Sequence, residues 1–148
     1  MNIERSAPTI LVADDDPDDR QWIKESLTET GKAGKLLFVV DGEDLMDFLH
    51  HSGKYTAMPS LSYPGLILLD LNMPKMDGRE ALKAIKSDAR LRHIPIIILT
   101  TSKAEHDIFH TYNLGANSVI LKPVTYAALV QIMTNLTRFW FDTAQLPL

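Results

Sequence analysis

Residues 66–78 read LILLDLNMPKMDG, and this stretch decides the fold. Four consecutive apolar residues end in Asp70, and Pro64 and Gly65 precede them. An apolar run bounded in this way predicts a short strand that is buried on both faces of a parallel sheet. Asp70 then lies at the carboxyl end of its strand, the edge at which open α/β sheets bind ligands. A lone Asp at this position commonly does no more than end a strand, so its importance depends on how the other strands end.

Four further apolar runs predict strands, the first two of the same buried kind. They cover residues 9–13, 36–40, 95–100 and 118–121. The segments between and after the strands have helical periodicity and helix-ending glycines. Helices are expected from the acidic turn at 14–19 to Gly31, and over about residues 43–50, 78–88, 104–113 and 125–141. Residues 51–65 are predicted to form a long loop. Five strands alternating with five helices predict an α/β fold, a parallel sheet covered on both faces.

Length and composition limit the function classes. The chain has 148 residues, of which 45% are hydrophobic, which suits one domain with an adequate core. It has no cysteine, so disulfides, thiolate metal sites and thiol catalysis are excluded. The formal charge of −4 and the absence of a basic stripe argue against direct nucleic-acid binding. No apolar run approaches the length of a membrane span, so we expect a cytoplasmic protein with no membrane partner.

Polar side chains of complementary chemistry follow four of the predicted strands. They are Asp14, Asp15, Asp70, Thr100 and Lys122. Because the carboxyl ends of parallel strands lie at one edge of a sheet, we expect all five to converge. Three crowded carboxylates repel one another unless a divalent cation joins them, and a donor set of oxygens favours Mg²⁺ or Mn²⁺ over zinc. A lysine and a hydroxyl beside that metal suit a phosphoryl group, and a carboxylate nucleophile there would form an aspartyl phosphate.

The order of these residues closely resembles that of the receiver domains of two-component response regulators. The matching residues, in chain order, are Asp14-Asp15, Asp70 within 70–78 (DLNMPKMDG), Thr100 and Lys122-Pro123. The resemblance covers about residues 8–141. It implies a flavodoxin-like fold with strand order 2-1-3-4-5. It also implies one receiver domain over residues 1–148, a single-domain regulator with no output domain.

The resemblance gives each residue a role. Asp70 would accept a phosphoryl group from the phosphohistidine of a histidine kinase. Asp15 and Asp70 would bind Mg²⁺ through their carboxylates. The backbone carbonyl of Asn72 would be a further ligand, and Asp14 would act mainly through metal-bound water. Such a protein is a signalling phosphoacceptor and not an enzyme, with at most slow self-phosphorylation from small donors and slow self-dephosphorylation.

Lys122 would pair with one phosphoryl oxygen, and the Thr100 hydroxyl would move to meet another. The added charge would change the surface around the fourth helix, fifth strand and fifth helix. Many receivers carry an aromatic residue three positions before the lysine, but Val119 stands there in this chain. Another element must therefore transmit the change. The family also implies a cis peptide bond between Lys122 and Pro123.

A narrower resemblance is to the stand-alone regulators that partner bacterial phytochrome kinases. The features that carry it are the long insertion before residue 66 and the segments 99–102, 112–117, 139–141 and 146–147. This subgroup implies a light-regulated histidine kinase as partner. It also implies a homodimer formed through the last strand and helices. The downstream protein stays unknown at this stage.

Three alternatives compete with the receiver hypothesis. Asp14, Asp16, Asp18 and Glu25 match the offsets of a calcium loop, but Asp19 replaces the glycine at the sixth position. Asp16, Asp18 and Asp19 are more simply residues of a helix start.

A phosphohydrolase of the haloacid-dehalogenase type would need a second Asp two residues after the nucleophile, and Asn72 stands there. Without a positioned acid or base, hydrolysis should be slow. A binding module with a silent site is disfavoured because all five chemical positions are intact.

Overall fold

The structure is a computed structural model, and it describes residues 8–32, 34–58, 63–101 and 103–147. Within these residues five strands form one parallel sheet in the order β2-β1-β3-β4-β5. The predicted α/β fold and strand order are therefore confirmed. The strands are β1 (Ile10–Ala13), β2 (Leu36–Val39), β3 (Leu66–Leu69), β4 (Ile96–Thr100) and β5 (Ser118–Leu121).

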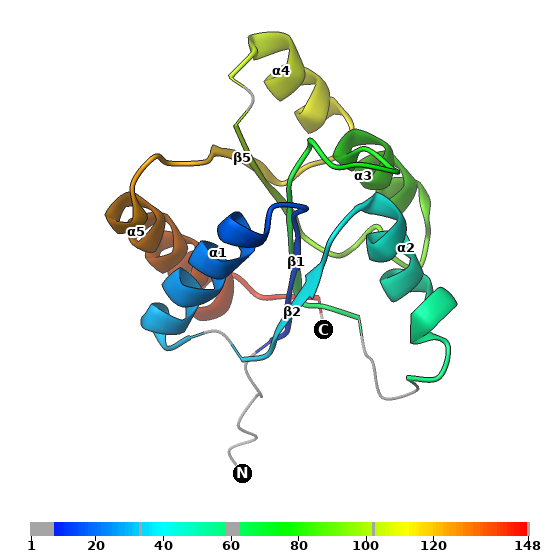
Figure 1. The fold of residues 1–148 in the computed structure, drawn as a ribbon, viewed down its shortest axis with the longest axis horizontal. Coiled ribbons are helices and arrows are strands. Elements are labelled where there is room, and N and C mark those ends of the chain that lie inside the picture. The colour runs from blue at the N-terminus through cyan, green and yellow to red at the C-terminus, as the bar shows by residue number, and fades with distance from the viewer. Residues whose placement is uncertain (1–7, 33, 59–62, 102, 148) are drawn as a thin grey trace.

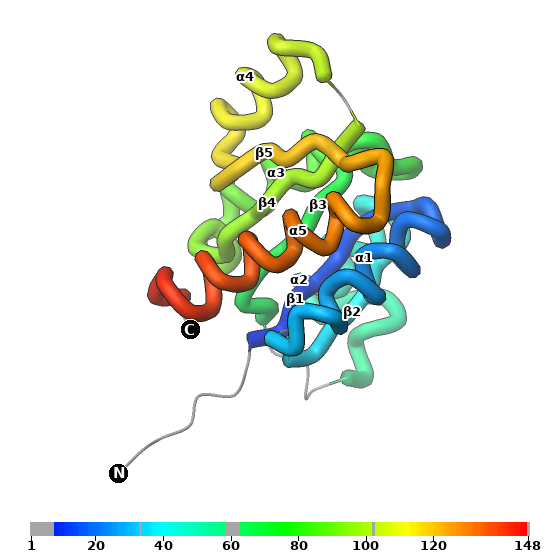
Figure 2. The backbone as a smooth tube through the Cα atoms, turned by 90° about the vertical axis from the view of Figure 1, so that its left-hand side faces the viewer, coloured from blue at the N-terminus to red at the C-terminus, as the bar shows by residue number. Residues whose placement is uncertain are grey.

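Helices cover both faces of the sheet. Helices α1 and α5 lie side by side on one face, α2 and α3 cover the other, and α4 lies beside the β5 edge (Figures 1 and 2). The helices are α1 (Pro17–Thr30), α2 (Gly42–His50), α3 (Gly78–Ser87), α4 (Glu105–Asn113) and α5 (Tyr126–Thr137). None of the helices in the described part of the chain combines the length and apolar character needed to cross a membrane.

The core consists of two apolar layers, because successive side chains of a strand point to opposite faces. In β1, Leu11 and Ala13 pack with residues of α2 and α3, whereas Ile10 and Val12 pack with residues of α1 and α5. All residues of β1, β3 and β4 are buried. These three central strands therefore hold their carboxyl ends in fixed positions relative to one another.

The structure departs from the predicted elements at three places. Strand β2 is only partly buried except at Val39, because it is an edge strand with a neighbour on one side only. The predicted loop contains a short 3₁₀ helix, η1 (Gly53–Tyr55), and its residues 59–62 lie outside the described part of the chain. The last helix was expected to run to residue 141, but α5 ends at Thr137 and continues as a π-helix, η2 (Arg138–Thr143).

Candidate functional site

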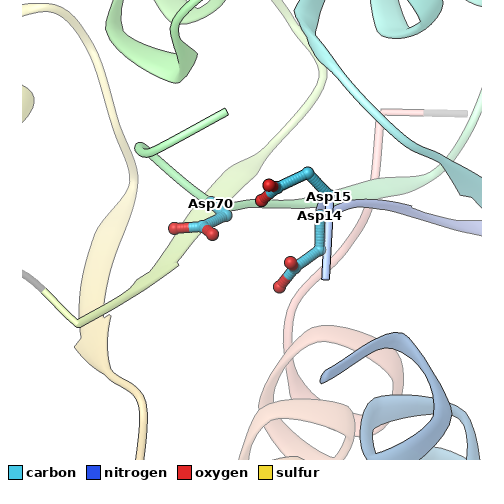
Figure 3. A group of neighbouring side chains, drawn as sticks. All are labelled: Asp14, Asp15 and Asp70. Carbon is cyan, nitrogen blue, oxygen red and sulfur yellow. The ribbon is translucent and has the colours of Figure 1, made fainter. Parts of the chain in front are cut away.

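Three carboxylates converge at the carboxyl edge of the sheet, as expected from the sequence. Asp14 and Asp15 follow β1, and Asp70 follows the neighbouring strand β3 (Figure 3). Asp14 and Asp70 are buried, while Asp15 is exposed. Each offers a carboxylate oxygen, and these oxygens all lie within 4.8 Å of one another.

The start of α1 fixes the first of these carboxylates. The Asp16 side chain caps the helix by accepting the backbone N–H groups of Asp18 and Asp19. The Asp16 backbone N–H in turn donates to Oδ1 of Asp14 (3.0 Å), and the Arg20 guanidinium donates to the Asp14 carbonyl (2.7 Å). Asp14 is thus held at both its side chain and its backbone, with its second carboxylate oxygen turned to the site.

Lys122 brings a cation to the carboxylates from the end of β5. Its ammonium nitrogen Nζ donates to Oδ2 of Asp14 (2.7 Å), Asp19 (2.8 Å) and Asp70 (3.2 Å). The side chain is only 11% exposed, so its ion pairs with the buried Asp14 and Asp70 are poorly screened by water. Its backbone N–H donates to the Thr100 carbonyl (2.8 Å), which ties the ends of β4 and β5 together.

The two remaining predicted residues lie beside Asp70. Thr100 is the last residue of β4, the strand next to β3, and it is fully buried. The Asn72 backbone N–H donates to Oδ1 of Asp70 at a long 3.4 Å. The roles of Thr100 in binding a phosphoryl oxygen and of the Asn72 carbonyl in binding metal stay predictions.

A close contact fixes the backbone of Asp70. The Gly78 N–H, at the start of α3, donates to the Leu71 carbonyl (2.8 Å). A Cβ atom at Gly78 would lie 2.2 Å from the Asp70 carbonyl oxygen and 2.7 Å from Leu71 Cα, so only glycine fits there. The first turn of α3 therefore packs directly against the main chain of the candidate nucleophile.

Burial dominates the electrostatics of the carboxylates. It raises the pKa of both Asp14 and Asp70, and the interactions with Lys122 offset this only in part. Burial alone would lower the pKa of Lys122, but its hydrogen bonds to Asp14 and Asp19 outweigh burial and raise it. The site thus keeps a charged lysine beside carboxylates whose negative charge is incompletely balanced.

The donor set fits a hard divalent cation. Carboxylate oxygens are ligands that Mg²⁺ and Mn²⁺ prefer, and the trio of Asp14, Asp15 and Asp70 supplies three of them within reach of one ion. A cation there would balance the charge that Lys122 leaves uncompensated.

The sequence prediction missed one member of the site and was wrong about one bond. Asp19 was assigned only to the helix start, yet its carboxylate contacts Lys122. The available signal was its spacing of four residues from the buried Ile23, which puts both on the sheet-facing side of α1. No cis peptide bond occurs in the described residues, so the Lys122–Pro123 bond is trans, the isomer that X-Pro bonds intrinsically favour.

A parallel sheet in this order, with carboxylates after β1 and β3 and a lysine after β5, defines the receiver class of signalling protein. The family model for the response regulator receiver domain matches residues 10–134, and the chain belongs to this family. Receiver domains are signalling proteins that histidine kinases phosphorylate and that bind Mg²⁺ or Mn²⁺ at an acidic cluster.

Individual relatives narrow the comparison. Response regulator Rcp1 of Synechocystis sp. is 36% identical over 148 residues, which cover 99% of each chain. The crystal structure of the phosphorylated cyanobacterial phytochrome response regulator RcpA matches with a TM-score of 0.88 and 41% identity, over 95% of this chain and 99% of that one. The Mn²⁺-bound form of Rcp1 matches with a TM-score of 0.87 and 35% identity, with the same coverage. The resemblance to phytochrome response regulators is thereby confirmed.

Proposed function

We propose that this chain accepts a phosphoryl group from a histidine kinase on Asp70, in a Mg²⁺-dependent reaction, and signals through a change of its surface. The observation that carries this proposal is the meeting of three carboxylates and Lys122 at the carboxyl ends of β1, β3 and β5. Such a site combines a nucleophile, a place for a divalent cation and a fixed positive charge.

The chemistry follows from these positions. An oxygen of Asp70 attacks the phosphorus of a phosphohistidine, the P–O bond forms as the P–N bond breaks, and the electron pair of that bond stays on the imidazole nitrogen. Lys122 Nζ lies 3.2 Å from Oδ2 of Asp70, close enough to pair with a phosphoryl oxygen there. The Thr100 hydroxyl would meet a second oxygen from the buried end of β4.

A bound Mg²⁺ would supply charge that offsets the carboxylates and the phosphoryl oxygens. Asp15 and Asp70 would hold it through their carboxylates, Asn72 through its backbone carbonyl, and Asp14 mainly through bound water. Small phosphodonors and water would react slowly at the same site, because Asn72 stands where a phosphohydrolase would carry its acid, two residues after the nucleophile.

The test is intact-protein mass spectrometry after incubation with acetyl phosphate and Mg²⁺. Wild type should gain one phosphoryl group, and Asp70→Asn should gain none, because the amide is not a nucleophile. Wild type without divalent cation is the matched control and should stay unmodified. A phosphoryl group that persists in Asp70→Asn would contradict the assignment of the acceptor.

The surface change would involve α4, which two contacts hold in place. The Arg79 guanidinium of α3 pairs with the Asp107 carboxylate of α4 at 3.1 Å. The Val119 backbone N–H of β5 donates to the Tyr112 hydroxyl of α4 at 3.1 Å. These contacts join α4 to the elements on either side of the site, so they can respond to the added charge where an aromatic residue is missing at position 119.

We infer that the kinase is a bacterial phytochrome and that the reaction takes place in the cytoplasm. The relative RcpA supports the first point, since it is a cyanobacterial phytochrome response regulator. The cytoplasmic location is supported by the need of a histidine kinase for ATP, which the cytoplasm supplies. Phosphotransfer from a phytochrome kinase autophosphorylated in vitro is the direct test, and failure with several such kinases would refute this partner.

A homodimer through β5, α5 and η2 also belongs to the proposal. Phe139 is 53% exposed, and together with Ile120, Ile132 and Trp140 it borders an open groove between the strand and the helices. Exposed apolar side chains at a groove suit an interface. Sedimentation velocity of wild type and Phe139→Ser decides the point, since a monomeric wild type at high concentration would refute the dimer.

A further inference from the structure

We propose that Asp19 is a positioning residue that holds Lys122 on the α1 side of the site and so competes with a phosphoryl group on Asp70 for the lysine. This inference rests on the proposed phosphoryl transfer. It assigns to a residue of the first turn of α1 control over how tightly the site holds its phosphoryl group.

The geometry of Lys122 carries the first step. An ammonium has three N–H donors, and Lys122 gives one each to Asp14, Asp19 and Asp70. All three donors are therefore in use before any phosphoryl group arrives. The contact with Asp19, at 2.8 Å, is as short as the contact with Asp14 and shorter than the 3.2 Å contact with Asp70.

The position of Asp19 carries the second step. It lies one helical turn beyond Asp15, and the group of carboxylates placed to share a metal consists of Asp14, Asp15 and Asp70 without it. A divalent cation there would draw on the oxygens of Asp14 and Asp70 and repel the ammonium. Asp19 lies outside this trio, so it stays available to Lys122 when the metal is bound.

Asp19 and a phosphoryl group on Asp70 therefore compete for the Lys122 ammonium. A phosphoryl group on Asp70 needs a donor from Lys122, and Asp19 holds the ammonium toward α1. The Asp19 side chain is 39% exposed, so the contact is partly screened and can exchange. Loss of the Asp19–Lys122 contact should change the affinity of the site for a phosphoryl group by about threefold to tenfold. This is the range expected for one partly exposed hydrogen bond between charged groups.

The experiment uses beryllofluoride as a phosphoryl mimic, titrated into the full chain with saturating Mg²⁺. Asp19→Asn should bind it about threefold to tenfold more tightly than wild type. Asp18→Asn is the matched control, because it removes the same charge from the same exposed turn while Lys122 donates to other carboxylates. Asp18→Asn should therefore differ from wild type by less than about twofold.

Two further readouts separate positioning from general damage. Asp19→Glu, which restores a carboxylate, should return the affinity toward that of wild type. The Mg²⁺ affinity of Asp19→Asn should not exceed that of Asp18→Asn, since neither residue belongs to the metal trio and Asp19 helps to hold the ammonium away from the metal. Equal or weaker beryllofluoride binding by Asp19→Asn relative to Asp18→Asn would overturn the inference alone, whereas a wild type that binds none would overturn the proposed function as well.

Discussion

Asp44 in α2 and Asp70 after β3 are two buried carboxyl groups with opposite properties. Their exposures are almost the same, at 9% and 7%. The pKa of Asp44 is nevertheless lowered from its ordinary value, and the pKa of Asp70 is raised. A similar surface exposure therefore does not give the two groups the same direction of pKa shift.

The two groups differ both in the donors around them and in depth, since burial weighs more heavily on Asp70. At Asp44, burial would raise the pKa, but three donors outweigh it: the Tyr55 hydroxyl (2.8 Å), the Val40 backbone N–H (3.0 Å) and the Lys54 ammonium (3.3 Å). From the described residues, Asp70 accepts long contacts from Lys122 and from the Asn72 N–H, at 3.2 and 3.4 Å.

An aspartate side chain can thus stabilise the fold or be available for chemistry, depending on its hydrogen bonds. Short hydrogen bonds that occupy both oxygens make Asp44 a structural group that joins β2, α2 and η1. Long contacts and neighbouring carboxylates make Asp70 a group whose ionised form is unfavourable until a cation or an electrophile arrives. Three substitutions test this contrast.

Replacing Asp44 with Ala should have the largest effect on stability. It leaves the buried hydroxyl of Tyr55 and the N–H of Val40 without their acceptor, which should lower the free energy of unfolding by about 3 kcal/mol. Urea unfolding measures the loss, and beryllofluoride binding should be unchanged. Tyr55→Phe is the control and should cost about 1 kcal/mol, because it removes one hydrogen bond and keeps the carboxylate. A loss below 1 kcal/mol for Asp44→Ala would show that the network is not structural.

Replacing Asp70 with Asn should have the opposite sign. In the absence of divalent cations at pH 7, the variant should be about 1 kcal/mol more stable, because it removes an incompletely balanced buried charge. The folded-state pKa of Asp70 lies above the ordinary 3.8, so its ionisation lowers stability as pH rises from 3.8 through the raised pKa. Below 3.8 both side chains are neutral, and the gain should vanish. Urea unfolding from pH 4 to pH 7 would contradict this if Asp70→Asn were the less stable protein at neutral pH.

Replacing Lys54 with Met should have the smallest effect. Its ammonium is 3.3 Å from Asp44, but its side chain is 67% exposed, so the ion pair should contribute less than about 0.5 kcal/mol. The stabilisation contributed by Asp44 would then come from its hydrogen bonds with Tyr55 and Val40. A measured cost above 1 kcal/mol would mean that Lys54, like Lys122, acts as a buried partner.

The carboxylates of the candidate site were predictable from the sequence because strand ends mark them. Apolar runs that stop at Asp14 and Asp70 fix both the strands and the edge at which the side chains meet, and the parallel topology brings Lys122 to the same edge. No knowledge of side-chain packing is needed for this inference.

Other contacts depend on packing that a linear pattern does not show. Asp44 and Tyr55 lie eleven residues apart, one in a helix and one in a stretch that looked like a loop, so their hydrogen bond follows only from the way η1 folds back onto α2. Asp19 looked like one more acid of a helix start, since its reach to Lys122 depends on how α1 packs on the sheet beside α5. The change to a π-helix after Thr137 likewise has no signal in the pattern of apolar residues.

The glycine at the start of α3 makes the two sides of the site mechanically unequal. With no side chain at position 78, the helix rests on the carbonyl of the candidate nucleophile and leaves that main chain no room to shift toward α3. The turn between β3 and α3 is therefore rigid. If a phosphoryl group is added to Asp70, the main chain at this turn would not move toward α3. The surface change proposed above would then be directed toward the ends of β4 and β5 and toward α4, which lies between them in the chain.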